Sequence, residues 1–314
     1  MSGEGRSFLS QPGAFLVSSP PGPTPAPHTA RLAYRLGYST EIFSTFASMS
    51  ALVGRSASTA VASCLAAGYC TTHPDVVRVV AKNLALLGHP GGSPDAARVF
   101  RNFAVTLADY FWLAGKTQEQ AHELADIEGS LPTLKTGAIL ATGHFGFFEF
   151  GALALTRVGI PVSIVTDAEP TPGLGRWRAD YRARWGAQTI ELGNDAFSSL
   201  RAAEAITAGR FAAMLVDRPV GGRSLAIGLP GGSIPFSMAP AILSWMTGCP
   251  IIPVSVRRTD RERYAVRTGT PVMADRSLPR DEALAACTRE VAAALIGDIQ
   301  RDPLQWYQFV PLSR

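Results

Sequence analysis

Hydrophobic positions recur at helical spacing through the first part of the chain. Residues 75–87 place apolar side chains three and four apart and end at Gly88, which is a typical helix stop. Ser93-Pro94 is a typical helix start, and an apolar stripe follows it through residues 97–113. Residues 118–128 predict one more short amphipathic helix. We therefore expect a mostly helical section over residues 31–128.

The pattern changes after Gly137, where short apolar runs alternate with amphipathic segments. Runs typical of strands cover residues 138–142, 162–166, 188–192, 211–216, 251–257 and 264–268, and helical patterns cover 173–185, 196–208 and 284–301. This alternation predicts an α/β core over residues 129–314, with a mixed central sheet flanked by helices. Together with the helical section it would form a single domain, 31–314. Residues 1–30 are rich in Pro, Ser and Gly, which predicts a flexible tail.

Composition narrows the class of protein further. The chain is 46% hydrophobic and only 17% charged, which excludes a disordered chain and provides for a large core. Its net charge of +4 is carried mostly by arginine, whose fork suits phosphate or carboxylate groups. We therefore consider a nucleotide-containing donor, a carrier protein or an anionic lipid surface as partners, and not nucleic acid. The 4 cysteines have no metal-ligand or disulfide spacing, so no metal is expected.

No segment predicts export or membrane insertion. Residues 1–30 lack the apolar run of a signal peptide. The best candidate for a transmembrane helix, residues 43–68, carries Arg55 and eight Ser or Thr residues, which makes insertion costly. We expect a cytoplasmic protein and leave open a peripheral contact with the inner face of the cell membrane.

The strongest candidate for chemistry is the segment TGHFGFFE at residues 142–149, which follows a predicted strand and opens a predicted helix. His144 lies in the turn, and Glu149 is close enough in sequence to reach back to its ring. A carboxylate on one imidazole nitrogen fixes the tautomer, so that the other nitrogen can take a proton from an attacking hydroxyl or amine. Such general-base help is worth about 10²–10⁴-fold in rate. The alternative is a structural histidine beside an aromatic cluster.

Other candidates have structural alternatives of about equal weight. Arg182 and Arg184 end an arginine-rich predicted helix and would bind an anion, or would line a solvated face. Asp217 and Arg218 end a buried strand and would border the site, or would form an internal ion pair. Further candidates are the aromatic residues Phe147 and Phe148, as the lining of an acyl-chain tunnel or as core, and Gly231, whose turn offers backbone N–H groups to an oxyanion or is an ordinary loop.

Four pieces of sequence, taken in order, resemble the bacterial lipid A acyltransferases (lauroyl and myristoyl transferases) and the related phosphatidylinositol mannoside acyltransferases. They are the helix with Asn83 and the aromatic helix after it, the motif at 142–149, residues 216–219 with 228–232, and residues 247–253 with 303–306. The resemblance covers residues 75–312. It implies a glycerolipid acyltransferase-like fold of the lysophospholipid acyltransferase-like superfamily, an H-x₄-D/E motif and no metal.

The chain departs from the resemblance in two places. We find no counterpart of the N-terminal membrane anchor of the lipid A enzymes. Gly231-Gly232 stand where the mannoside enzymes place a glutamate, which argues against a polyol acceptor held by a carboxylate.

The function expected is acyl transfer, with His144 as general base and Glu149 as its orienting acid. An acyl-CoA or acyl carrier protein thioester would be the co-substrate, with no other cofactor, and the acceptor would be a hydroxyl or amine of a lipid, sugar or secondary metabolite. The alternatives are a thioester hydrolase that uses the same dyad, and an inactive protein that binds lipid or carrier protein.

Overall fold

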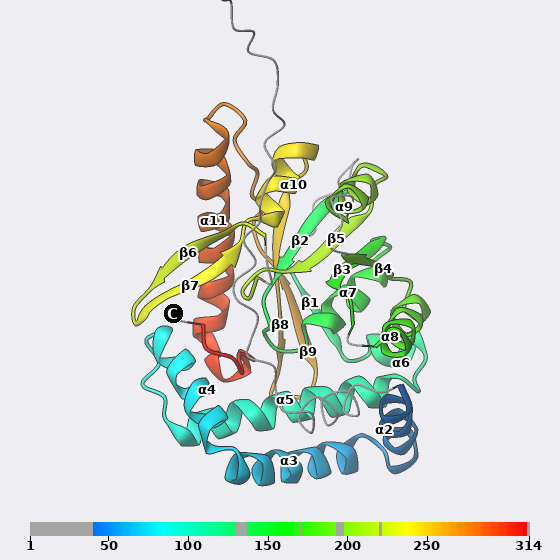
Figure 1. Cartoon of the computed structure of the whole chain (residues 1–314). Helices are drawn as coiled ribbons and strands as arrows, with labels where there is room; N and C mark the ends of the chain where they lie inside the picture. The colour runs from blue at the N-terminus through cyan, green and yellow to red at the C-terminus, as the bar shows by residue number, and fades with distance from the viewer. Residues whose placement is uncertain (1–39, 130–136, 170, 193–197, 220–221, 313–314) are drawn as a thin grey trace, which may run out of the picture.

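A computed structural model describes residues 40–129, 137–169, 171–192, 198–219 and 222–312 (Figure 1). The predicted tail over residues 1–30 lies outside this part of the chain. The helices are α2 (Thr40–Val53), α3 (Arg55–Thr72), α4 (Pro74–Leu86), α5 (Ser93–Leu113), α6 (Gln118–His122), α7 (Phe148–Thr156), α8 (Pro172–Arg184), α9 (Ser198–Thr207), α10 (Ala239–Thr247), α11 (Arg280–Arg301) and the 3₁₀ turn η1 (Pro303–Gln305).

A mixed sheet forms the centre of the molecule. Its strands are β1 (Ala125–Glu128), β2 (Ala138–Thr142), β3 (Val162–Asp167), β4 (Gln188–Leu192), β5 (Phe211–Leu215), β8 (Ile251–Arg258) and β9 (Tyr264–Thr268), in the order β1-β9-β8-β2-β5-β3-β4. Only the pair β8 and β9 is antiparallel within this sheet. A separate hairpin is formed by β6 (Ser224–Leu229) and β7 (Gly232–Ser237).

Both faces of the sheet are buried. Along β2, Ile139 and Ala141 pack into a core shared with α9, α10 and α11, whereas Ala138 and Leu140 face a second core shared with α7, α8 and the end of α5. The strand is apolar throughout because helices cover it on both sides. These layers confirm the predicted α/β core and the helical section that precedes it.

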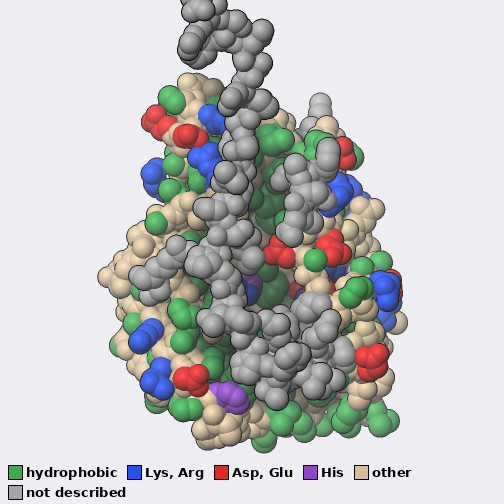
Figure 2. All heavy atoms as spheres, in the orientation of Figure 1, with side chains coloured by type: hydrophobic (Ala, Val, Ile, Leu, Met, Phe, Trp, Pro, Cys, Tyr) green, Lys and Arg blue, Asp and Glu red, His purple; other side chains and the backbone are tan. Residues whose placement is uncertain are grey.

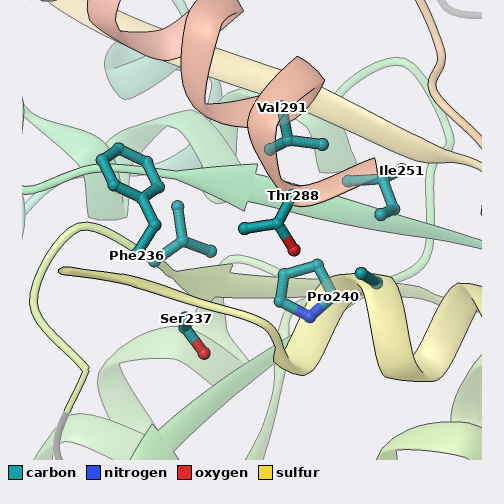
Figure 3. Close-up of a pocket in the computed structure, with 8 residues that line it drawn as sticks. Phe236, Ser237, Pro240, Ile251, Thr288 and Val291 are labelled. Carbon is teal, nitrogen blue, oxygen red and sulfur yellow. The ribbon is translucent and has the colours of Figure 1, made fainter. Parts of the chain in front are cut away.

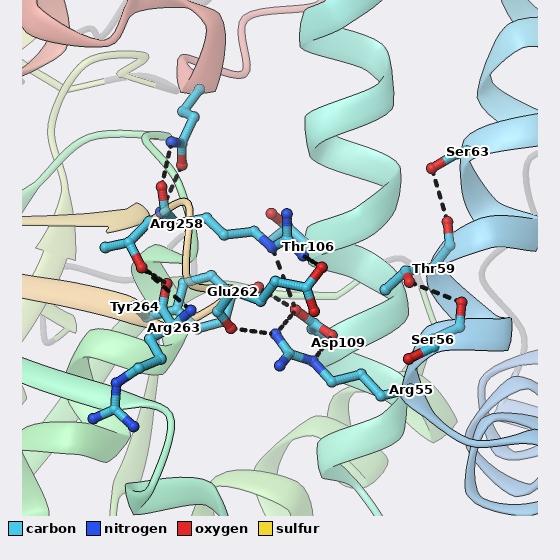
Figure 4. A network of polar contacts seen from close by, with 12 residues as sticks. Arg55, Ser56, Thr59, Ser63, Thr106, Asp109, Arg258, Glu262, Arg263 and Tyr264 are labelled. Carbon is cyan, nitrogen blue, oxygen red and sulfur yellow. Dashed lines mark hydrogen bonds and ion pairs between the residues drawn. The ribbon is translucent and has the colours of Figure 1, made fainter.

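The helical section is fastened to the sheet by a buried ionic network. Figure 1 shows α3 and α5 running side by side beneath the sheet. Asp109 of α5 has no exposed surface and accepts two hydrogen bonds from the Arg55 guanidinium, at 2.7 and 2.8 Å. The Tyr264 hydroxyl of β9 donates to the same carboxylate at 2.5 Å (Figure 4). One carboxylate thus joins α3, α5 and the sheet.

The structure differs from the sequence-based elements in three places. The predicted helix over 118–128 ends at His122, and Ala125–Glu128 pairs with β9 as a parallel edge strand. The two strands on either side of Gly231 were not predicted, although the turn predicted there is the tip of their hairpin. Helix α10 was not predicted either. Among the described residues, no helix combines the length and the apolar character needed to cross a membrane.

Candidate functional site

His144 lies in the loop between β2 and α7, at the carboxyl end of a central strand. The loop turns sharply at Gly146, which has a positive φ of 54°, and a Cβ there would lie 1.7 Å from the Val256 carbonyl oxygen. Only glycine fits this position. Tyr307 donates its backbone N–H to the His144 carbonyl at 2.7 Å, and Gly146 donates to the Gln305 carbonyl at 2.8 Å. The C-terminal segment therefore holds the histidine loop in place.

Asp217 lies just after β5, at the same edge of the sheet as His144. Strands β2 and β5 are parallel neighbours, with Thr142 in register with Leu215, so the residues that follow them meet. The His144 Nδ1 atom lies 2.7 Å from Asp217 Oδ1, and the His144 backbone N–H donates to Oδ2 at 2.9 Å. A Cβ at position 143 would lie 3.0 Å from Oδ2, so Gly143 allows this close approach.

The Asp217 carboxylate is fully buried and accepts hydrogen bonds from His144, Trp306 and Gln308. Trp306 Nε1 and Gln308 Nε2 each donate to Oδ2 at 2.8 Å. Burial alone would raise the pKa of this carboxyl, but the interaction with His144 and the hydrogen bonds from His144 and Trp306 outweigh it and lower the pKa. Asp217 is therefore held as an anion.

An ionised Asp217 fixes the tautomer of His144. Because the carboxylate can only accept, Nδ1 carries the proton and Nε2 keeps its lone pair. Nε2 faces the Arg218 guanidinium, with Nη2 at 2.9 Å. The side chain of His144 retains 13% exposure. The arrangement provides an oriented base whose reactive nitrogen is covered by a neighbouring cation.

Glu149 does not occupy the predicted place on the His144 ring. Its carboxylate accepts from Arg182 Nε at 2.7 Å and lies 3.7 Å from Arg178, both on α8. The prediction placed His144 in the turn and Glu149 in the following helix, within reach of the ring. In the structure α7 begins at Phe148, after the turn at Gly146, so Glu149 faces α8. The orienting carboxylate in this structure is Asp217.

The Glu149–Arg182 pair is itself deeply buried. Arg182 is only 4% exposed, and Glu149 8%. Burial pushes the pKa of Glu149 upward, but the charges of Arg182 and Arg178 outweigh burial and lower it. The ion pair therefore links the start of α7 to α8, and each charge compensates the other.

The two candidate phenylalanines have separate positions. Phe148 contacts the His144 ring edge to face, with centroids 5.6 Å apart. Phe147 is buried and packs on Phe150 and Tyr264, at 5.4 and 5.1 Å between ring centroids. Of the two, the structure brings only Phe148 to the histidine.

Gly231 and Arg184 lie elsewhere in the structure. Gly231 donates its backbone N–H to the Leu86 carbonyl at 3.0 Å, and a Cβ there would lie 2.3 Å from the Ala85 carbonyl oxygen. Its N–H is thus used in packing the hairpin tip on α4. Arg184 donates to the Ala114 carbonyl at 2.7 Å, at the end of α5. The structure does not bring either residue to His144.

Sequence reasoning missed Trp306 and Gln308, which it treated as packing elements or left out. Their indole N–H and amide carry no local signal, since their partner lies 89 and 91 residues away. The isolated β-bridge between Phe145 and Trp306 places them beside the histidine loop. A buried polar pair near the end of an otherwise complete fold was the one available hint.

A small cavity lies beside Val216, the residue that precedes Asp217 (Figure 3). Its volume of about 10 Å³ is bounded by Phe236, Pro240, Ile251, Thr288 and Val291, among others. Such a space holds one water molecule and is too small for an organic ligand.

Comparison with known families gives a match over most of the chain. The model of a family described as bacterial lipid A biosynthesis acyltransferase matches residues 51–313, which span the helical section, the sheet and the C-terminal segment around Trp306. No curated protein matches the chain.

Proposed function

The chain belongs to the bacterial lipid A biosynthesis acyltransferase family, and on that premise we propose that His144 is the general base that transfers a fatty acyl group from a thioester to its acceptor. The observation that carries the proposal is the 2.7 Å contact between His144 Nδ1 and a buried, ionised Asp217. It leaves Nε2 as the basic atom, at the carboxyl end of a central strand where ligands of such sheets bind.

The proposed reaction needs a single transfer step. Nε2 takes the proton from the acceptor hydroxyl or amine as the acceptor oxygen or nitrogen attacks the thioester carbonyl. The tetrahedral intermediate then collapses, the carbon–sulfur bond breaks, and the thiolate takes the proton back from Nε2. Asp217 stabilises the imidazolium that forms between these events. No acyl-enzyme is required, because a thioester is already an activated donor.

Arg218 must leave Nε2 before the base can act. At a distance of 2.9 Å, the Arg218 guanidinium donates a hydrogen bond to the lone pair of Nε2. That lone pair must be free to take the proton of the acceptor. We propose that an anionic group of the donor, or the oxyanion of the intermediate, draws Arg218 away and is bound by it. Arrival of the donor would thus expose the base.

We assign Glu149 and Arg182 to the positioning of the site. Their ion pair joins the first turn of α7 to α8, and α7 begins directly after the histidine loop. A carboxylate in the first turn also suits the positive end of the helix dipole. In this proposal Glu149 holds the start of α7, and with it the histidine loop, against α8. Asp217 orients the His144 ring.

The family and the chemistry of the site support a proposal for the donor and the acceptor. The family transfers acyl groups to lipid acceptors; we propose an acyl-CoA or acyl carrier protein thioester as donor, with no further cofactor. The acceptor group would be a hydroxyl or amine on a lipid or a lipid-like product, reached by a cytoplasmic enzyme that contacts the membrane from its surface.

A thiol-release assay tests the proposal. The purified chain and its His144→Ala variant are incubated with a panel of acyl-CoA and acyl carrier protein thioesters, with and without hydroxyl and amine acceptors. We expect release that needs both the acceptor and His144, with a loss of about 10²–10⁴-fold in the variant. Release that needs His144 but no acceptor would indicate hydrolysis. Equal release by both proteins, or none from any thioester, would overturn the proposal.

A further inference from the structure

Helix α3 presents its apolar side to solvent. Exposed apolar positions recur along the helix and include Ala57, Ala60, Val61, Cys64, Leu65 and Gly68. Val61 and Leu65 are 58% and 63% exposed, and the buried residues of the helix are Ser58 and Ala66. A helix on a water-exposed surface normally has the reverse arrangement, with polar groups outward.

Helix α2 extends the same apolar surface. Phe46, Met49, Leu52 and Val53 are exposed by 45%, 55%, 86% and 52%. We call these four residues together with Val61 and Leu65 the α2–α3 face. Hydrophobic side chains gather along the lower right margin of the molecule, where Figure 1 places α2 and the adjoining part of α3 (Figure 2). Exposed large apolar side chains gathered on two consecutive helices mark an interaction site.

These helices carry little charge, and several hydroxyls of α3 are bonded within the helix. From residue 42 to 72 the only charged side chain is Arg55, which turns inward to Asp109. Ser63 donates to the Thr59 carbonyl at 2.8 Å, and Thr59 donates to the Ser56 carbonyl at 3.0 Å. These groups keep their partners in a medium of low dielectric.

A tryptophan flanked by two cations borders the face. Lys116 lies over the Trp112 ring at 4.6 Å, and Arg55 at 5.7 Å. This edge adjoins α2, because a Cβ at Gly115 would lie 3.3 Å from that of Ala51. Tryptophan with neighbouring cations suits the boundary between acyl chains and headgroups, and cations favour anionic lipids.

The α2–α3 face is continuous with the helix that supports the site. Phe43 of α2 packs on Trp177 of α8 at 5.4 Å between ring centroids, and α8 carries the Arg182 that binds Glu149. A hollow of about 280 Å³ lies between α2 and α8, lined by Ser44, Ser48, Tyr181 and Arg184 among others. A binding partner that contacts α2 would therefore lie close to α8, one of the elements that position the histidine loop.

We infer that the α2–α3 face docks on the surface of an anionic bilayer and so brings the chain to its lipid acceptor. The second clause rests on the proposed function, whereas docking itself does not. The apolar side chains would enter the boundary between headgroups and acyl chains, while Lys116 remains at headgroup level. A lipid surface is favoured over a second copy because the chain carries a net charge of +4, which repels an identical chain and attracts an anionic surface.

Vesicle flotation of the full chain tests the inference. Leu52→Glu and Leu65→Glu each place one charge on the face at exposed positions, where folding should tolerate it. Met246→Glu is the matched control, since Met246 is 50% exposed on α10, at the opposite end of the molecule (Figure 1). With vesicles of phosphatidylcholine and phosphatidylglycerol, we expect each face variant to reduce partitioning at least about tenfold and the control to match wild type.

Two further measurements separate the possible outcomes. Circular dichroism, and thiol release from a soluble thioester in the presence of a soluble acceptor, should be unchanged in both face variants, so loss of flotation alone assigns the effect to the surface. Thiol release absent from wild type, with flotation intact, would overturn the proposed function and leave docking in place. Wild-type flotation no stronger than that of the face variants would overturn docking. So would a wild-type dimer that the face variants convert to monomer without any flotation.

Discussion

At the scale of single residues, the catalytic assignment depends on which carboxylate touches His144. Asp217 binds both the ring and the backbone N–H of His144 and accepts from Trp306 and Gln308, whereas Glu149 is bound by Arg182. Only Asp217 can hold the tautomer in which Nε2 is basic. Glu149 can affect the reaction only through the position of the loop.

Asp217→Asn should therefore lower kcat by about 10²–10⁴-fold, with the KM for the thioester changed only a few-fold. An amide in place of the carboxylate no longer stabilises the imidazolium and can present a donor to Nδ1. Steady-state kinetics beside Glu149→Gln provide the test, with folding of both variants checked by circular dichroism. A folded Asp217→Asn enzyme with near wild-type kcat, beside a folded Glu149→Gln enzyme that has lost it, would reverse the assignment.

The sequence singled out His144, Glu149, Asp217 and Arg218 as site residues, but it did not show which of them meet. Asp217 lies 73 residues after His144. Their contact depends on β2 and β5 being neighbours, and nothing local in the sequence specifies the strand order. The spacing of Glu149 suggested a direct bond to the ring because the turn at Gly146 could not be foreseen.

At the scale of elements, Asp109 joins the helical section to the sheet. Its carboxylate has no exposed surface and binds Arg55 of α3 and Tyr264 of β9. Removal of its charge leaves a guanidinium that is 17% exposed facing a neutral group. The loss of one partner from a buried ion pair is much more costly than the loss of a surface pair.

Asp109→Asn should lower the free energy of unfolding by about 3 kcal/mol or more. Asp95→Asn on the same helix is the control, because Asp95 is partly exposed and pairs with Arg98 and His89 near the surface. We expect that control to cost less than about 1 kcal/mol. Urea denaturation followed by circular dichroism measures both. Equal midpoints for the two variants would show that the buried network does not hold the section to the sheet.

The strands and helices of the core follow from hydrophobic spacing, because burial on both faces leaves near-continuous apolar runs such as residues 138–142. The edge strand β1 and the β6–β7 hairpin were missed. Ala125–Glu128 is short, with an exposed final residue, and the hairpin's burial alternates only weakly. Short elements held by their partners leave little trace in local sequence.

At the scale of the whole molecule, the sheet, its two helical layers and the C-terminal segment meet at one histidine. Residues 305–308 return from the far end of the chain to bind the loop and the carboxylate, and they lie within the range that the family model matches. The helical section lies beneath the sheet and presents the α2–α3 face on its outer side. Chemistry and surface attachment are thus assigned to different parts of one fold.

The most direct test of acyl transfer by His144 is the mass of the products formed from one thioester and one acceptor. The account predicts acylated acceptor and free thiol in equal amounts with the wild-type protein, and neither above background with His144→Ala. Free fatty acid and thiol in equal amounts, at a rate indifferent to the acceptor, would contradict it and identify a hydrolase.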